Sequence, residues 1–116
     1  MKTMPEQPLY EVILSEEVRG FLKGLNPKAV NKIITNIRYV AHGLQDNELF
    51  KKLEGTEIWE FRTLYSGIAY RLLAFWDTRH NALIITTHGF IKKTDKTPKK
   101  EIDKAERKRN EYFITK

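Results

Sequence analysis

A β-hairpin in the middle of the chain constrains the fold more than any other stretch. Residues 58–64 and 68–76 are rich in β-branched and aromatic types, and Ser66-Gly67 stands between the two runs. Such a dipeptide between strand-like segments predicts a tight two-residue turn. Counting outward from this turn places Arg62 directly opposite Arg71. The chain is therefore expected to form an antiparallel sheet around this hairpin.

The two opposed arginines need an anion nearby. Like charges that face each other across a β-ladder destabilise it unless something negative lies between or beside them. A phosphate group would satisfy both side chains. The alternative is a structural ion pair, because Glu60 lies diagonally across the hairpin from Arg71 and could hold Arg62 as well. Arg71 also interrupts an otherwise apolar strand, so this residue in particular needs a partner.

The N-terminal third predicts a strand followed by two helices. Residues 9–14 combine β-branched and apolar residues with one polar break, which is typical of a strand. Ser15 and Asn26 are good helix N-caps, and apolar residues recur at helical spacing after each of them. Gly24 and Gly43 are expected to end these helices. The short connection predicts a helical hairpin whose apolar side must pack against a sheet.

The two strands of the β-hairpin provide a sheet face on which the helices can pack. We assign one face to the helices, and its side chains are Trp59, Phe61, Tyr70 and Leu72. A third strand over residues 82–88 follows the polar turn 77–81, and its short connection favours an antiparallel meander. A charged last helix with a thin apolar stripe is expected to start near Thr97-Pro98. The order β-α-α-β-β-β-α predicts an α+β fold with an antiparallel sheet of about four strands and a single domain over residues 1–116.

Composition and charge limit the partners, metal sites and cellular location that we expect for the protein. Of the net charge of +6, residues 92–116 carry most, with ten Lys or Arg against five Asp or Glu. A basic end suits a polyanionic partner, although a solvated helix face is an equally good interpretation. The chain has no cysteine, and its three histidines show no metal-ligand spacing, so we predict no metal and no cofactor. No apolar run is long enough for a membrane span and residues 1–6 lack a signal-peptide pattern, which predicts a cytoplasmic protein.

Four short motifs occur in order between residues 51 and 93. They are Lys-x-Leu-x-Gly at 51–55, Trp-Glu-Phe-Arg at 59–62, Tyr70-Arg71, and Gly-Phe-Ile-Lys-Lys at 89–93. In this order and spacing, the chain resembles the RelE/ParE superfamily of bacterial type II toxins, and within it the HigB branch. The resemblance implies a RelE-like fold and ribonuclease action on messenger RNA, usually on the ribosome. It also implies a small helix-turn-helix antitoxin as a partner.

The residue chemistry is compatible with such a nuclease. RNA carries its own nucleophile, the 2′-hydroxyl, so cations that stabilise the developing charge on the phosphate supply most of what the reaction needs. The candidate catalytic residues are Arg71, Arg62, Lys92, Lys93 and His88. The candidate RNA-backbone contacts are Lys51, Lys52 and Lys96.

Several expectations about these candidates follow. We expect Arg62, Arg71 and Lys92 to share one exposed concavity, with Arg71 removable at little cost in stability. Lys92 and Lys93 are expected in a loop after the third strand, and a lysine crowded by arginines should have its charged form disfavoured. His88, at the end of that strand, could act as an acid or base. Some relatives place a tyrosine after Lys93, which this chain lacks, so the general base stays open.

Two other functions compete with the nuclease. The first is a non-catalytic inhibitor of DNA gyrase, as in ParE-type members of the same superfamily. The second is a phage-derived regulator that binds RNA or a host protein without cutting it. The opposed arginines and the Lys92-Lys93 pair favour the nuclease.

Overall fold

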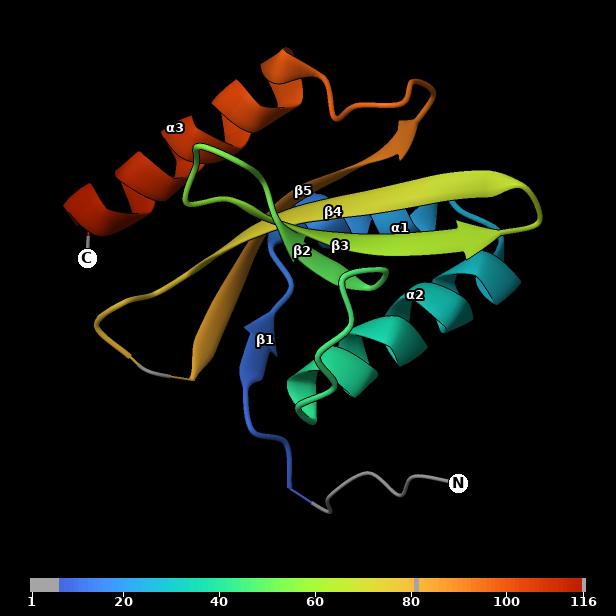
Figure 1. Cartoon of the computed structure of the whole chain (residues 1–116), viewed down its shortest axis with the longest axis horizontal. Helices are drawn as coiled ribbons and strands as arrows, with labels where there is room; N and C mark the ends of the chain where they lie inside the picture. Colours follow the sequence, from blue (N-terminus) through green and yellow to red (C-terminus); the bar gives the residue numbers. More distant parts are fainter. Residues whose placement is uncertain (1–6, 81, 116) are drawn as a thin grey trace.

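A five-stranded mixed sheet separates two layers of helix in the computed structural model of the chain, which describes residues 7–80 and 82–115 (Figure 1). The elements are β1 (Glu11–Ile13), α1 (Glu16–Lys23), α2 (Pro27–Ala41), β2 (Phe50–Lys52), β3 (Trp59–Tyr65), β4 (Ile68–Trp76), β5 (Leu83–Lys92) and α3 (Lys99–Thr115). The strand order is β1-β5-β4-β3-β2. The helices α1 and α2 lie on one side of the sheet and α3 on the other.

The β3–β4 hairpin has the expected register. Arg62 pairs with Arg71 and Tyr65 with Ile68. The turn residues Ser66 and Gly67 have φ angles of 52° and 79°, which are the positive values that a two-residue hairpin turn of this kind requires. The sequence prediction of this hairpin is confirmed.

Two features of the sheet differ from the sequence prediction. The strand β1 pairs with β5 in parallel, so the sheet is mixed and not wholly antiparallel. Residues Lys51 and Lys52 belong to a fifth strand, β2, which pairs antiparallel with β3. A three-residue strand with two lysines shows no alternation that sequence could reveal, and its pairing with β3 stabilises it instead.

The strand β5 is longer than expected. It runs to Lys92, so His88 lies inside the strand and Lys92 ends it, whereas sequence placed Lys92 in a loop. Pairing with β4 extends from Ile84 to Lys92 and explains the extra length of β5. The register of this pairing shifts between Leu73 and Ala74 of β4. The β4–β5 connection is the antiparallel meander that was expected, although Asn81 of the expected turn lies outside the described residues.

The caps of the first two helices are as predicted. The Ser15 side chain accepts a hydrogen bond from Val18 N at 3.0 Å, and Asn26 Oδ1 accepts one from Lys28 N at 2.8 Å. Gly24 caps the end of α1, and Gly43, with a φ of 100°, follows the end of α2. Both helices pack on the sheet face of Phe61, Tyr70 and Leu72, which confirms the assigned face.

Gly89 of β5 explains how closely α1 approaches the sheet. A Cβ atom at this position would lie 2.5 Å from Phe21 Cδ2 and 2.7 Å from Leu72 Cδ2. The missing side chain therefore lets Phe21 pack directly against the strand.

The helix α3 covers part of the opposite sheet face. Its buried Ala105 packs with Ile58, Leu73 and Phe75 in a second, smaller core, against which Tyr112 also packs. This arrangement is consistent with the RelE-like α+β fold that the sequence predicts. Within the described residues, no helix has the length and apolar character that crossing a membrane requires.

Candidate functional site

Four neighbouring strands each place one cation on the sheet face that α3 partly covers. Lys51 of β2 pairs with Glu60 of β3, and Arg62 of β3 pairs with Arg71 of β4. Lys92 of β5 pairs with Ala69, two residues along β4 from Arg71, so it lies diagonally beside that arginine. Residues directly paired across strands share a face. We call Lys51, Arg62, Arg71 and Lys92 the cationic cluster.

Glu60 lies within this cluster and is shared between its arginines. Its carboxylate is 2% exposed, and Oε1 lies 3.5 Å from Arg71 Nε and 3.6 Å from Arg62 Nε. The hydroxyl of Thr97, in the loop before α3, donates a hydrogen bond to Oε2 of the same carboxylate. The buried carboxylate pairs with two of the four cations, and the charge of Glu48 also acts on Arg71. Four cations against these two carboxylates leave this part of the sheet with an excess of positive charge.

Both guanidinium groups have unused hydrogen-bonding capacity. Arg71 Nη1 donates to the carbonyl of Tyr70 at 3.0 Å, and Arg62 Nη1 donates to the carbonyl of Asn47 at 3.2 Å. The Nε atoms of both arginines are buried against Glu60 Oε1, where they form ion pairs but no hydrogen bond. The guanidinium N–H groups that neither Glu60 nor a backbone carbonyl engages can donate to an anion such as a phosphate oxygen.

The burial of Arg71 contradicts the expected exposed concavity. Arg71 is only 7% exposed, because it lies on a central strand against Glu60, whereas Arg62 is partly exposed. Burial also lowers the pKa of Arg71 below its usual range, and the neighbouring Arg62 adds to this effect. The structural ion pair that sequence left as an alternative is thus present, and it coexists with the cationic cluster.

Lys92 has the electrostatic environment that sequence reasoning anticipated. Its pKa is lowered from the ordinary lysine value, first by burial and then by the positive charge of Arg71, with Arg62 and Lys51 contributing less. Glu60 acts in the opposite direction. Lys92 is therefore a partly buried ammonium that gives up its proton more readily than a free lysine does.

The other lysines lie around the cluster and not in it. Lys93 and Lys96 are exposed in the segment that leads from β5 to α3, where Thr94 Oγ1 donates to the carbonyl of Lys96 at 2.8 Å. Lys52 is exposed at the end of β2, on the other face from Lys51. Of the lysines considered from sequence, the structure brings Lys51 and Lys92 together with the arginines.

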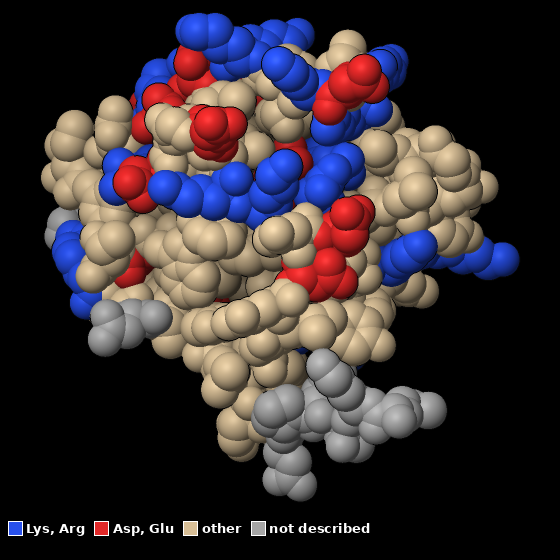
Figure 2. Space-filling model, in the orientation of Figure 1, with Lys and Arg blue, Asp and Glu red and all other residues tan. Residues whose placement is uncertain are grey.

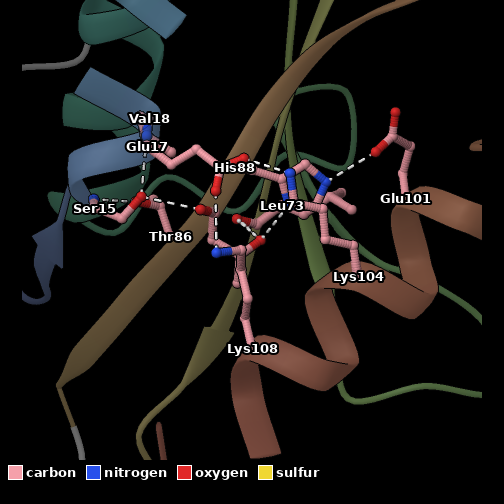
Figure 3. Close-up of polar contacts among 10 residues, drawn as sticks. Ser15, Glu17, Val18, Leu73, Thr86, His88, Glu101, Lys104 and Lys108 are labelled. Carbon is pink, nitrogen blue, oxygen red and sulfur yellow. Dashed lines mark hydrogen bonds and ion pairs between the residues drawn. The ribbon is translucent and has the colours of Figure 1, made fainter. Parts of the chain in front are cut away.

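His88 belongs to a separate polar network beneath α3 (Figure 3). It is 2% exposed, with Nε2 at 3.1 Å from Glu101 Oε1 and Nδ1 at 3.0 Å from Thr87 Oγ1. Burial lowers its pKa, and the charge of Lys104 on α3 acts in the same direction. The structure therefore places His88 under the helix, with Phe90 between it and Lys92 along β5.

Sequence reasoning missed two parts of this site. The first is Thr97, whose bond to Glu60 ties the loop before α3 to the cluster. The second is Asn47, whose carbonyl holds Arg62 from the loop before β2. Both contacts join segments that are far apart in the chain, so no local pattern signals them. Among the described residues, no three His, Asp or Glu side chains converge as ligands for a metal ion.

Fold and site together define a small α+β protein whose sheet carries a cationic cluster around one buried carboxylate. Residues 20–110 match the family described as phage derived protein Gp49-like (DUF891), and the chain belongs to this family. A search of curated proteins finds no match to the chain.

Proposed function

We propose that this protein is the toxin of a type II toxin–antitoxin system and that it cleaves messenger RNA on the ribosome. The observation that carries the proposal is the pair of opposed arginines, which one carboxylate holds beside the partly buried Lys92. The Gp49-like family is associated with toxins of such systems, which also supports it. As such a toxin, the protein would act in the cytoplasm and be neutralised by a helix-turn-helix antitoxin.

The proposed reaction is an attack of the RNA 2′-oxygen on the adjacent phosphorus. A bond forms between O2′ and phosphorus while the bond from phosphorus to O5′ breaks, which yields a 2′,3′-cyclic phosphate and a free 5′-hydroxyl. The 2′-hydroxyl loses its proton to a base, and the departing O5′ takes up a proton from an acid. Negative charge grows on the non-bridging oxygens in the transition state, and fixed cations stabilise it.

The cationic cluster can supply most of these roles. Arg62 and Arg71 would bind the phosphate oxygens through the guanidinium N–H groups that Glu60 and the backbone carbonyls leave free, a role that a lysine cannot reproduce. Lys92 would stabilise the same oxygens and donate the proton to O5′, a role for which its lowered pKa is suited. We leave His88 out of this scheme because Thr87 and Glu101 engage both its ring nitrogens. Lys93, a candidate catalytic residue from sequence, is exposed in the segment after β5 and outside the cluster, so the scheme gives it no proton-transfer role.

Lys51 of the cationic cluster and two lysines outside it would contact the RNA backbone. Lys51 lies on the sheet face of the arginines, and Lys52 and Lys96 are exposed near its margins. Contacts of this kind position a nucleic acid without reading its sequence. Figure 2 shows further Lys and Arg side chains gathered over the upper part of the molecule, where α3 lies in Figure 1.

The proposal is tested by expressing the protein alone and mapping RNA 5′ ends in the same cells by primer extension. We expect growth arrest together with new cleavage sites inside translated messages. Arrest without cleavage, combined with inhibition of supercoiling by purified protein and gyrase, would favour the gyrase inhibitor.

The second candidate function is a phage-derived regulator, which the description of the matched family as phage derived also supports. A regulator would bind RNA or a host protein and leave both the message and DNA supercoiling unchanged. This pattern in the same two assays would replace the nuclease proposal.

A further inference from the structure

A pocket of about 430 Å³ lies on the opposite side of the sheet from the cationic cluster, and its walls are aromatic. Tyr10, Phe50, Trp59 and Trp76 line it, and the rings contact one another. Tyr10 meets Trp76 edge-on at 5.0 Å between ring centroids, and Phe50 stacks on Trp59 at 4.8 Å. The volume lies within the ~300–1,000 Å³ typical of small-molecule sites.

The rim of this pocket is polar. It is formed by the loop between α2 and β2, which contributes Gln45, Asp46 and Asn47. The loop is held in shape by Asp46, because its Oδ1 accepts from Glu48 N at 2.8 Å and its carbonyl accepts from Leu49 N and Phe50 N at 2.9 Å each. Two amide side chains and one carboxylate therefore border a pocket that is lined by aromatic rings.

The pocket and the cationic cluster meet at the edge strand β2. Successive side chains of a strand point to opposite faces. Phe50 therefore lines the pocket while the next residue, Lys51, belongs to the cluster. Asn47 makes a second connection, since it lines the pocket and its carbonyl accepts from Arg62 Nη1 at 3.2 Å.

We propose that this pocket binds a nucleobase of single-stranded RNA whose backbone lies on Lys51 and Arg62. The inference rests on the proposed function, because that function makes RNA the ligand, and it adds a subsite that binds a base. Aromatic side chains bind unstacked bases by stacking, and nearby polar groups bind the base edges. The Asp46 carboxylate only accepts hydrogen bonds, so it favours adenine, cytosine and guanine, whose exocyclic amine donates. Uracil has one edge donor, N3–H, which lies between two carbonyl oxygens that a carboxylate repels.

The tryptophans provide a direct test. The chain has only two, Trp59 and Trp76, and both line this pocket, so tryptophan emission reports on it alone. The probes are end-labelled 2′-O-methyl tetranucleotides of A, C, G and U, which cannot undergo 2′-oxygen attack. We expect the label's anisotropy and the quenching of tryptophan emission to saturate at the same oligonucleotide concentration for A, C and G, with weaker binding of U.

A matched pair of variants tests the polar rim. Asp46→Asn keeps an oxygen that can accept from Glu48 N but removes the charge, so it should weaken binding of the A, C and G probes about tenfold. It should leave binding of the U probe unchanged. Glu54→Gln removes one charge from an exposed position away from the pocket and should change neither reading.

Several results would overturn the base-binding subsite. Anisotropy that rises without tryptophan quenching would show that RNA binds elsewhere, and it would leave the proposed nuclease intact. Absence of both signals, or quenching by a protein partner but by none of the four probes, would also refute a nucleobase site. Loss of message cleavage in cells with quenching retained would instead reject the nuclease and keep the pocket.

Discussion

Glu60 determines what each arginine of the cationic cluster does for the fold. Its buried carboxylate lies within 3.6 Å of Nε of both Arg62 and Arg71, and Thr97 donates to it as well. Sequence reasoning weighed a phosphate clamp against an ion pair with Glu60. Both arginines use Nε for the ion pair with Glu60, and their remaining guanidinium N–H groups are the ones that can donate to an anion. The two interpretations are therefore compatible at the level of a single residue.

Arg71→Ala should destabilise the protein substantially. Removing one partner of a buried ion pair costs about 3–5 kcal/mol, because the remaining charge loses its compensation. Arg62 and Thr97 still contact Glu60, so we expect the lower end of this range. Urea denaturation measures the change in the free energy of unfolding, with Arg71→Lys as the control that keeps a positive charge. A change within 1 kcal/mol for Arg71→Ala would restore the sequence-based expectation of a dispensable side chain.

His88 should make stability depend on pH. Burial holds its pKa in the folded state below the ordinary value of 6.5, so the unfolded chain binds a proton first as the pH falls. This contribution to stability is complete above pH 6.5 and is lost as the pH drops toward the folded-state pKa. Glu101, Lys104 and Glu17 are the charged groups that act on the ring.

The His88 prediction is measured as melting temperature against pH between about 5 and 8, a range that spans the ordinary histidine pKa. The parent should lose stability below pH 6.5, and His88→Gln should have a flatter profile over the same range. Parallel profiles for the two proteins would show that His88 does not titrate as described.

At the scale of elements, sequence predicted the long, strongly patterned segments and failed at the short ones. The hairpin, the caps at Ser15 and Asn26, and the helix-covered face all depend on local chemistry that is visible in the residues themselves. The strand β2 and the parallel β1–β5 pairing depend on partners elsewhere in the chain. The same reason explains the site, where the arginine pair was predictable but the contact of Thr97 was not.

Two glycine substitutions should change stability in opposite directions. Gly67 has a φ of 79°, so Gly67→Ala forces a side chain into the left-handed region at a cost of about 1–2 kcal/mol. Gly20 lies inside α1, and Gly20→Ala should stabilise the protein by about 0.5–1 kcal/mol through helix propensity. At both positions an added Cβ would meet no atom of the described residues within 4 Å. Thermal or urea unfolding compares the two variants, and equal signs would contradict the turn geometry.

At the scale of the whole molecule, α3 closes the second sheet face through contacts at several points along its length. Lys104 and Lys108 form ion pairs with Glu17 of α1, and Tyr112 donates to the buried Asp77 at 2.7 Å. Arg79 and Tyr112 hold the pKa of Asp77 well below its usual range. The helix thereby packs over the sheet beside the cationic cluster, and the loop that precedes it reaches Glu60 through Thr97.

The central claim is that the cationic cluster catalyses cleavage of RNA, and the pair Lys92→Gln and Lys93→Gln tests it most directly. The two variants remove the same charge at adjacent residues, but only Lys92 belongs to the cationic cluster and lies diagonally beside Arg71. The measurement is the rate of message cleavage by purified protein on programmed ribosomes, with melting temperatures of all three proteins. We expect Lys92→Gln to slow cleavage about 10²–10³-fold at an unchanged melting temperature, and Lys93→Gln to stay near the parent rate. Equal rates for the parent and Lys92→Gln, with both proteins folded, would contradict the account.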